Sequence, residues 1–204
     1  MQTTTKPKVT CYSEGEDEFM RKSQEFRGTL LRPLLALLAR CGVTPNHLTL
    51  LSLLTGLAFC PLFLWGFKLT AFVALLAHVV LDGLDGPLAR STGRSSNQGS
   101  FADTASDQVV VTLTTVTMIH AGYAGLWPGV LYLFFYSIVV IFAMVRNALA
   151  IPYSWLVRPR FFVYLCIPVS VYWWRASLEI LLWVFALLLG LKTLTGFVKI
   201  RRQM

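Results

Sequence analysis

Acidic residues are almost absent from the apolar body of this 204-residue chain. Between Phe26 and Leu178 only four occur, all of them aspartates between positions 82 and 107. Charged residues make up 14% of the sequence, well below the roughly 25% of soluble domains. Hydrophobic residues make up 55% and come in long runs rather than at amphipathic spacing. These features exclude an ordinary soluble domain and indicate an integral membrane protein.

Two further features exclude other classes of protein. The chain has only four cysteines and they show no metal-ligand spacing, so we expect unpaired small apolar residues rather than a zinc site. The net charge of +8 is compatible with nucleic-acid binding, but the basic residues are spread along the chain. Membrane topology explains them better, and we expect no nucleic-acid partner.

The expected fold is all-α, with six transmembrane helices preceded by a cytoplasmic interfacial amphipathic helix. Residues 1–25 are polar and are expected to form a flexible cytoplasmic arm. Residues 26–45 form the interfacial helix and its turn, because apolar residues alternate there with Arg27, Arg32 and Arg40. Residues 46–204 form the six-span domain. The spans are expected roughly at 47–67, 69–89, 101–122, 129–151, 161–174 and 178–198.

The positions of Lys and Arg predict the orientation. With the N-terminus in the cytoplasm, the segment 90–94, the turn with Arg158 and Arg160 and the basic C-terminal tail all lie inside. Only Lys68 and Arg175 fall in outer loops. Both termini and all four aspartates are therefore expected at the cytoplasmic face, and the membrane is expected to be a bacterial inner membrane.

The four aspartates form two pairs with helical spacing. Asp82 and Asp85 are three residues apart, and Asp103 and Asp107 are four apart, so each pair lies on one face of its helix. A loop rich in Gly, Ser and Thr joins the two helices, which can stand antiparallel with their carboxylates converging. A charge among membrane helices costs about 3 kcal/mol or more, so a positive partner is needed. An all-oxygen cluster suits Mg²⁺ or Mn²⁺, and four carboxylates can hold two such ions.

Neighbouring residues suit a phosphate ligand. Gly86 and Gly99 would let backbone approach a nucleotide closely, and Arg90 is placed to meet phosphate oxygens. Close helix packing is the alternative for the glycines, and a topology charge is the alternative for Arg90.

The whole segment reads D-x₂-D-G-x₂-A-R-x₈-G-x₃-D-x₃-D and resembles the signature of the CDP-alcohol phosphotransferases. The match covers every defined position: Asp82, Asp85, Gly86, Ala89, Arg90, Gly99, Asp103 and Asp107. The sequence TPNHLT at positions 44–49 is similar to the segment that leads into the first span in this family. The six-span layout also matches, whereas the remaining spans are only generically similar.

The resemblance implies transfer of a substituted phosphate from a CDP-linked donor to an alcohol, with release of CMP. It implies that Asp82, Asp85, Asp103 and Asp107 bind the metal ions and that Asp107 also serves as the general base. It implies a donor site made by Asn46, Thr49, Asp82, Gly86, Ala89, Arg90, Ser96 and Gly99. Helix capping is an alternative role for Asn46 and Thr49. We also expect a homodimer.

Basic residues at the cytoplasmic ends suggest the acceptor. Arg146 resembles the basic position that family members with phosphorylated acceptors place near the active site, although snorkelling to the interface is an alternative. Arg158 and Arg160 are further candidates for acceptor binding. His78, one turn before Asp82, either supports the metal site or packs between helices.

We therefore expect an enzyme of phospholipid biosynthesis that uses CDP-diacylglycerol and a small polar acceptor, with glycerol-3-phosphate and inositol phosphate as the leading candidates. An alternative is a choline- or ethanolamine-type phosphotransferase with a CDP-alcohol donor and diacylglycerol as acceptor, which the motif does not separate. A divalent-metal transporter and a non-catalytic scaffold are alternatives of other classes. Arg90 argues against the transporter, because it would repel a cation.

Overall fold

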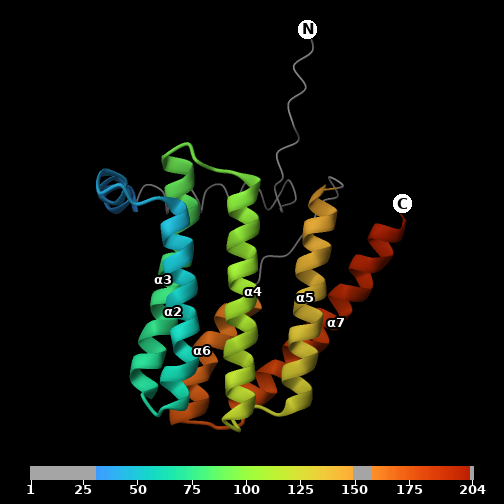
Figure 1. Ribbon diagram of the computed structural model, residues 1–204. Coiled ribbons are helices and arrows are strands. Elements are labelled where there is room, and N and C mark those ends of the chain that lie inside the picture. The colour runs from blue at the N-terminus through green and yellow to red at the C-terminus, as the bar shows by residue number, and fades with distance from the viewer. Residues whose placement is uncertain (1–30, 149–157, 203–204) are drawn as a thin grey trace.

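The computed structural model describes residues 31–148 and 158–202, and all regular structure in these ranges is helical (Figure 1). A short helix covers residues 31–40. The others are α2 (Pro45–Leu64), α3 (Lys68–Ser91), α4 (Asn97–His120), α5 (Leu126–Ala148), α6 (Pro159–Tyr172) and α7 (Ser177–Arg201). The prediction of an all-α fold is confirmed for this part of the chain. The predicted arm 1–25, the start of the interfacial helix at 26–30 and the last residues of the fourth span, 149–151, lie outside the described residues.

Local sequence signals start the helices that carry the site. Thr44 caps α2 by accepting a hydrogen bond from the backbone N–H of His47 at 3.3 Å, and His47 Nδ1 accepts one from the Thr44 N–H at 3.4 Å. Ser96 caps α4 by accepting from the N–H of Gly99 at 3.0 Å. Pro159 stands in the first turn of α6, where its missing N–H costs nothing. These caps fix where the functional residues fall along each helix.

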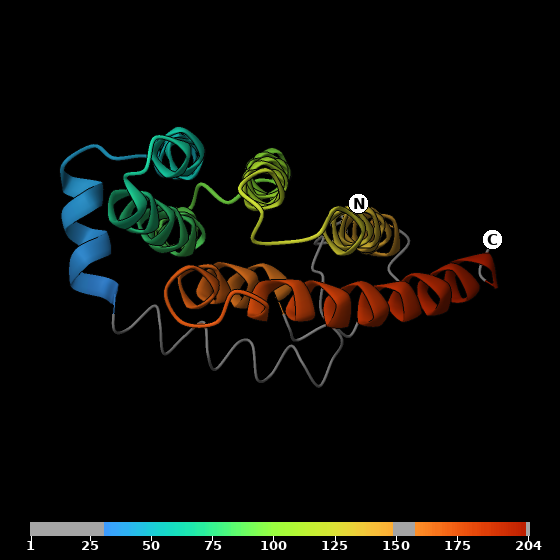
Figure 2. The same ribbon diagram turned by 90° about the horizontal axis from the view of Figure 1, so that it is seen from below.

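The helices pack as two groups. Helix α2 packs against α3 and α4, helix α7 packs against α5 and α6, and contacts of α4 with α5 and of α3 with α6 join the groups. Seen along the bundle, α2, α4 and α5 form one row, and α3, α6 and α7 lie beside it (Figure 2). Helix α6 begins part-way down the bundle rather than at its end (Figure 1). Its first turn therefore lies inside the molecule.

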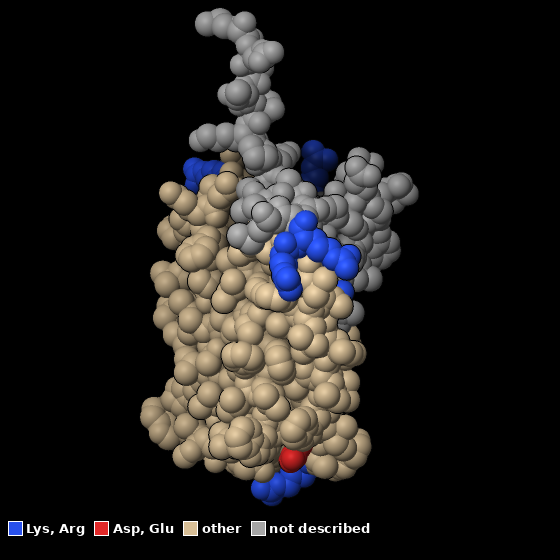
Figure 3. Space-filling view, turned by 90° about the vertical axis from the view of Figure 1, so that its right-hand side faces the viewer, with Lys and Arg blue, Asp and Glu red and all other residues tan. Residues whose placement is uncertain are grey.

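Four helices are long and apolar enough to cross a membrane: α2, α3, α5 and α7. Figure 3 shows a wide uncharged band on one face of the molecule, with Lys and Arg gathered toward the ends. Helix α6 has 14 residues, or about 21 Å at 1.5 Å per residue, which is short for a hydrocarbon core of about 30 Å. Helix α4 has 24 residues but carries two aspartates and several threonines. Length and composition of the described helices thus support four of the six predicted spans.

The 31–40 helix lies beside the bundle, near one end of α2 and α3, and runs crosswise to the long helices (Figures 1 and 2). Its Leu35 is buried and packs with Leu48 of α2 and Leu88 of α3, while Arg32 and Arg40 are exposed. These contacts hold the 31–40 helix against the end of α3 that carries the aspartates. Its placement at a membrane surface remains a prediction.

Helices α2 and α4 approach closely at Gly56. A Cβ atom there would lie 2.6 and 2.7 Å from the two methyl carbons of Val110, which is fully buried and stiff at χ1. We therefore expect Gly56→Ala to lower stability by about 1–3 kcal/mol, the usual cost of overpacking. The measurement is the thermal unfolding midpoint of the purified protein in detergent.

The matched control is Gly83→Ala in α3, where an added Cβ meets no atom within 4 Å. This variant should melt at or slightly above the wild-type temperature, because alanine favours a helix over glycine. Equal melting of the two variants would show that the α2–α4 contact is not tight at Gly56.

Candidate functional site

Three carboxylates from two helices converge inside the bundle. One oxygen each of Asp82 on α3 and of Asp103 and Asp107 on α4 lie within 4.8 Å of one another. All three residues are partly buried. Asp103 and Asp107 share a face of α4 because they are four residues apart. Helix α2 packs against both α3 and α4 and so holds the two sides of the cluster in register.

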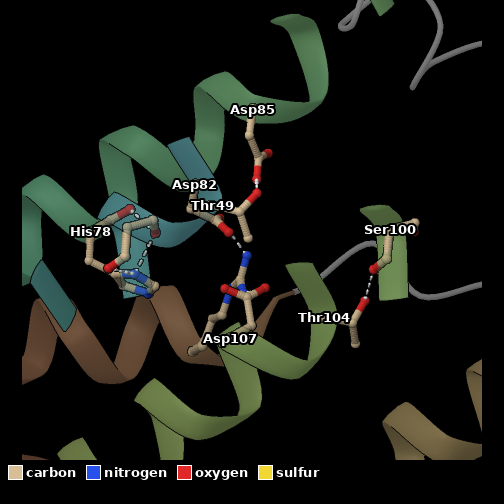
Figure 4. A network of polar contacts seen from close by, with 9 residues as sticks. Thr49, His78, Asp82, Asp85, Ser100, Thr104 and Asp107 are labelled. Atoms are coloured by element: carbon tan, nitrogen blue, oxygen red, sulfur yellow. Dashed lines mark hydrogen bonds and ion pairs between the residues drawn. The ribbon is translucent and has the colours of Figure 1, made fainter. Parts of the chain in front are cut away.

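The fourth aspartate of the motif lies beside this cluster. Asp85 is buried, and its Oδ2 accepts a hydrogen bond from the hydroxyl of Thr49 at 2.7 Å (Figure 4). The Thr49 hydroxyl also lies 3.2 Å from the Pro45 carbonyl oxygen. Asp85 interacts electrostatically with Asp82 and Asp103, but it is not part of the group whose oxygens lie within 4.8 Å. Thr49 thus connects the start of α2 to the carboxylate site, whereas the α2 cap is Thr44.

Arg160 brings a positive charge from α6 into the cluster. Its Nη2 lies 2.8 Å from Asp82 Oδ2, and its Nη1 is ion-paired with Asp107 Oδ2. The Arg160 side chain is 4% exposed, and its guanidinium lies over the Phe161 ring, 4.8 Å from the centroid. The guanidinium thus bridges a carboxylate of α3 and a carboxylate of α4. From the sequence, Arg160 is predicted only to bind the acceptor. Its ion pairs with the aspartates are not predicted, because no local pattern connects residues that are 53 or more positions apart.

The clustered carboxylates are suitable ligands for a divalent cation such as Mg²⁺ or Mn²⁺. The cluster offers only carboxylate oxygens, which are the ligands that such hard ions prefer. Asp107 Oδ1 is buried and has no hydrogen-bond partner among the described residues, while Oδ2 pairs with Arg160. A buried carboxylate oxygen in that position calls for a cation or a proton-bearing ligand.

His78 links helices beneath the cluster. It is 2% exposed, and its Nδ1 lies 2.8 Å from the hydroxyl oxygen of Ser52 on α2. Its ring stands edge-on to that of Tyr164 on α6, with centroids 5.9 Å apart. These contacts give His78 a helix-packing role among α2, α3 and α6, one of the two roles expected for it.

The remaining motif residues surround the C-terminal end of α3 and the start of α4. Asn46 and Arg90 are exposed, and Ala89 is half-buried. A Cβ on Gly86 would lie 3.4 Å from Arg90 Nη1, so the arginine folds back over this glycine. Ser96 and Gly99 form the α4 cap. Arg90 lines a pocket of about 440 Å³ between α3 and the 31–40 helix, together with Arg32, Pro87 and Ser91.

A second pocket, of about 190 Å³, opens beside the carboxylates. Its polar lining comes from Asp103, Thr104, Asp107, Tyr136, Arg158 and Arg160. Ala143 of α5 also lines it, and Arg146, one turn further along α5, is 5% exposed. Two of the three predicted acceptor-binding arginines therefore line this pocket, and the third lies one helical turn beyond it.

Comparison with known proteins gives the context for this geometry. The family model for CDP-alcohol phosphatidyltransferase matches residues 42–194. The archaetidylinositol phosphate synthase of Aeropyrum pernix is 27% identical over 135 residues, which cover 66% of this chain and 63% of that protein. The CDP-diacylglycerol–serine O-phosphatidyltransferase of Mycobacterium bovis is 29% identical over 109 residues, covering 52% of this chain and 38% of that protein. The chain thus spans less than two thirds of the length of these relatives.

A solved structure shows the same fold. The phosphatidylinositol phosphate synthase of Mycobacterium tuberculosis, crystallised with manganese and citrate, superposes with a TM-score of 0.68 at 20% identity. The match covers 81% of this chain and 86% of that one. The family model covers the helices that carry the carboxylates, and four long helices are apolar enough to cross a membrane. The chain is therefore an integral membrane protein that belongs to the CDP-alcohol phosphatidyltransferase family.

Proposed function

We propose that this protein transfers the phosphatidyl group of CDP-diacylglycerol to a small, phosphorylated polar alcohol and releases CMP. The observation that carries the proposal is the pocket that joins Asp103 and Asp107 to Arg158 and Arg160. A carboxylate cluster beside two arginines suits a reaction in which both substrates carry phosphate. The names of the Aeropyrum and Mycobacterium tuberculosis relatives, both inositol phosphate-type synthases, agree with a phosphorylated acceptor.

The metal site of this enzyme would be made by Asp82, Asp85, Asp103 and Asp107. Three of these offer oxygens close enough to share an ion, and Asp85 lies beside them. Bound Mg²⁺ or Mn²⁺, as one ion or two, would neutralise the donor pyrophosphate and improve CMP as a leaving group. The carboxylates hold their positions through α2, because Thr49 anchors Asp85.

Asp107 is our candidate for the general base. Its buried Oδ1 has no hydrogen-bond partner in the described part of the chain. Asp107 also lines the 190 Å³ pocket, which is the proposed acceptor pocket. In the proposed reaction Oδ1 takes the proton of the acceptor hydroxyl, whose oxygen bonds to the phosphatidyl phosphorus. The bond from that phosphorus to the bridging pyrophosphate oxygen breaks, and CMP leaves with the electron pair.

The donor site would lie around the start of α2, the end of α3 and the cap of α4. Its residues are Asn46, Thr49, Asp82, Gly86, Ala89, Arg90, Ser96 and Gly99. Two observations support this site. Gly86 has no side chain and lies beside Arg90. Ser96 caps the N-terminus of α4, where backbone N–H groups and the helix dipole favour phosphate.

We also propose that the chain crosses the membrane six times, with the carboxylates and both termini in the cytoplasm. Six helices, α2 to α7, follow one another along the chain, which supports six crossings. The less apolar α4 packs against the apolar α2 and α5, and the short α6 packs against the apolar α3 and α7. The concentration of Lys and Arg at the end that carries the α3–α4 connection supports the orientation. A bacterial inner membrane and a homodimer complete the proposal.

Arg146 gives a test of the acceptor. If it helps to hold an acceptor phosphate, Arg146→Ala should raise the acceptor KM by roughly tenfold to a hundredfold, because a charge-assisted contact is worth about 1.5–3 kcal/mol. The donor KM should change far less. Steady-state kinetics with each substrate varied in turn makes the comparison. Equal effects on both KM values, or no effect on either, would remove the basis for a phosphorylated acceptor.

The substrates are identified by offering the purified protein CDP-diacylglycerol, Mg²⁺ or Mn²⁺, and a panel of acceptors. The panel includes glycerol-3-phosphate, inositol phosphate, inositol, glycerol and serine, and the lipid product is identified by mass. We expect a product only with a phosphorylated acceptor. A product from serine or unphosphorylated inositol would contradict the acceptor assignment, and turnover only with CDP-choline or CDP-ethanolamine and diacylglycerol would reverse the donor assignment.

A further inference from the structure

Arg160 contacts two of the three clustered carboxylates with its two terminal nitrogens. Nη2 lies 2.8 Å from Asp82 Oδ2, and Nη1 pairs with Asp107 Oδ2. The side chains of Arg160 and Asp82 are only 4% and 6% exposed, so water screens this charge pair weakly. Arg160 thus occupies oxygens of the same carboxylates that are candidate ligands for a cation.

A guanidinium and a divalent cation compete electrostatically at this point, even where they bind different oxygens of the same carboxylate. Each Arg160 contact occupies a carboxylate oxygen and places a positive charge beside the cluster, which repels a further cation. Arg160 forms salt bridges to two of the three clustered aspartates, Asp82 and Asp107. The guanidinium is therefore positioned as a competitor for the metal rather than as one of its ligands.

We propose that Arg160 is an internal counter-ion of the metal site, which binds Asp82 and Asp107 before metal arrives and turns toward the acceptor pocket when metal binds. This inference rests on the proposed function, because it concerns the same site. It makes Arg160 a positioning residue that couples two ligands. Metal binding frees the guanidinium for an acceptor anion, and the anion in turn holds the guanidinium away from the carboxylates.

The structure provides a place for the displaced side chain. Arg160 already lines the 190 Å³ pocket, together with Arg158 and Tyr136. Its Cα lies in the first turn of α6, which begins inside the bundle (Figure 1). The guanidinium can therefore move from the carboxylates to the pocket by side-chain rotation. Two arginines facing that pocket would suit a phosphate group.

The test measures Mn²⁺ binding by electron paramagnetic resonance on the full chain in detergent, without substrates or turnover. Arg160→Gln removes the competitor, and we expect its apparent Mn²⁺ affinity to rise about tenfold over the wild type, equivalent to about 1.4 kcal/mol. Arg160→Lys keeps one charge but cannot bridge two carboxylates, so its affinity should fall between the two. Arg94→Gln is the matched control, because it removes an exposed positive charge from the nearby α3–α4 connection.

Thermal unfolding and phosphate binding complete the test. In EDTA, the melting temperature of Arg160→Gln should be below that of the wild type, since Asp82 and Asp107 lose their counter-ion. Adding Mn²⁺ should make the two melting temperatures more similar. Inorganic phosphate should tighten Mn²⁺ binding to the wild type but not to Arg160→Gln, because coupling between ligands is reciprocal.

The outcomes separate the two proposals. If wild-type protein binds Mn²⁺ and Arg160→Gln or Arg160→Lys binds it equally well or more weakly, the counter-ion role is wrong while the proposed function stands. An equal rise in Arg94→Gln would also overturn it, because a general charge effect would then explain the change. If the wild-type protein binds no Mn²⁺, the metal site of the proposed function and the inference built on it both fail.

Discussion

Asp107→Asn should bind the CDP-linked donor with only a modest loss of affinity while turnover falls by about a hundredfold or more, the usual scale for a general base. Asparagine keeps the shape of the side chain and one oxygen ligand but cannot accept the proton of the acceptor hydroxyl. Asp107 is suited to this role because its buried Oδ1 has no hydrogen-bond partner within the described residues. Donor titration by calorimetry and initial rates on the same preparation measure the two effects.

Asp82→Asn is the comparison that makes this result specific. Asp82 lies in the carboxylate cluster but does not line the acceptor pocket. Its substitution should weaken metal and donor binding together, whereas Asp107→Asn should mainly lower the rate. Near-normal turnover in Asp107→Asn would assign proton transfer to another group, and the proposed mechanism would then be wrong.

Removal of divalent cations should abolish turnover, and Mg²⁺ or Mn²⁺ should restore it. Asp82, Asp103 and Asp107 each bring one carboxylate oxygen within 4.8 Å of the others. The single charge of Arg160 does not balance three carboxylates, so a divalent cation is needed before a phosphate-bearing donor can approach. Initial rates in excess EDTA, followed by titration with each metal, test this dependence. Activity that survives exhaustive chelation would contradict the metal site.

Asp103→Asn provides the matching variant. It removes one charge from the shared site, so metal binding and activity should be lost in parallel. Ser106→Ala is a suitable control, because Ser106 lies on the same helix between the two aspartates but is not part of the cluster. This control should keep both metal binding and turnover.

Spacing along the chain was enough to predict part of the site. Separations of three and four residues, on helices joined by a short polar loop, predicted that carboxylates would converge, and the structure brings Asp82, Asp103 and Asp107 together. The membership of the family was recognisable from eight residues between positions 82 and 107, and the match to the family model confirms it. Both features depend on local sequence, which is read directly from one chain.

Contacts between distant segments could not be predicted in the same way. Arg160 reaches Asp82 across 78 positions, and Thr49 reaches Asp85 across 36, so neither contact follows from helical periodicity. The 14 residues of α6, and its start within the bundle, place Arg160 among the carboxylates. His47 also escaped notice, although a polar side chain three residues after Thr44 is a recognisable capping pattern.

Length and composition identify only four of the six predicted spans, for a physical reason. Helix α4 carries the aspartates and a series of threonines, and Thr114, Thr115 and Thr117 are buried. Its polar residues lower its mean hydropathy while facing other helices, so composition alone does not qualify it as a span. Hydropathy alone therefore does not decide whether such a helix crosses the membrane, because polar and ionisable residues of membrane helices usually face the interior of the bundle.

The most direct test of the proposed function is acceptor-dependent release of CMP from CDP-diacylglycerol by the purified protein in the presence of Mn²⁺. The wild type should release CMP when a phosphorylated alcohol is added, in equal amounts with the new phospholipid, and Asp103→Asn should release none. Absence of CMP release with every acceptor and every CDP-linked donor, from folded protein that binds Mn²⁺, would contradict the assignment as a phosphatidyltransferase.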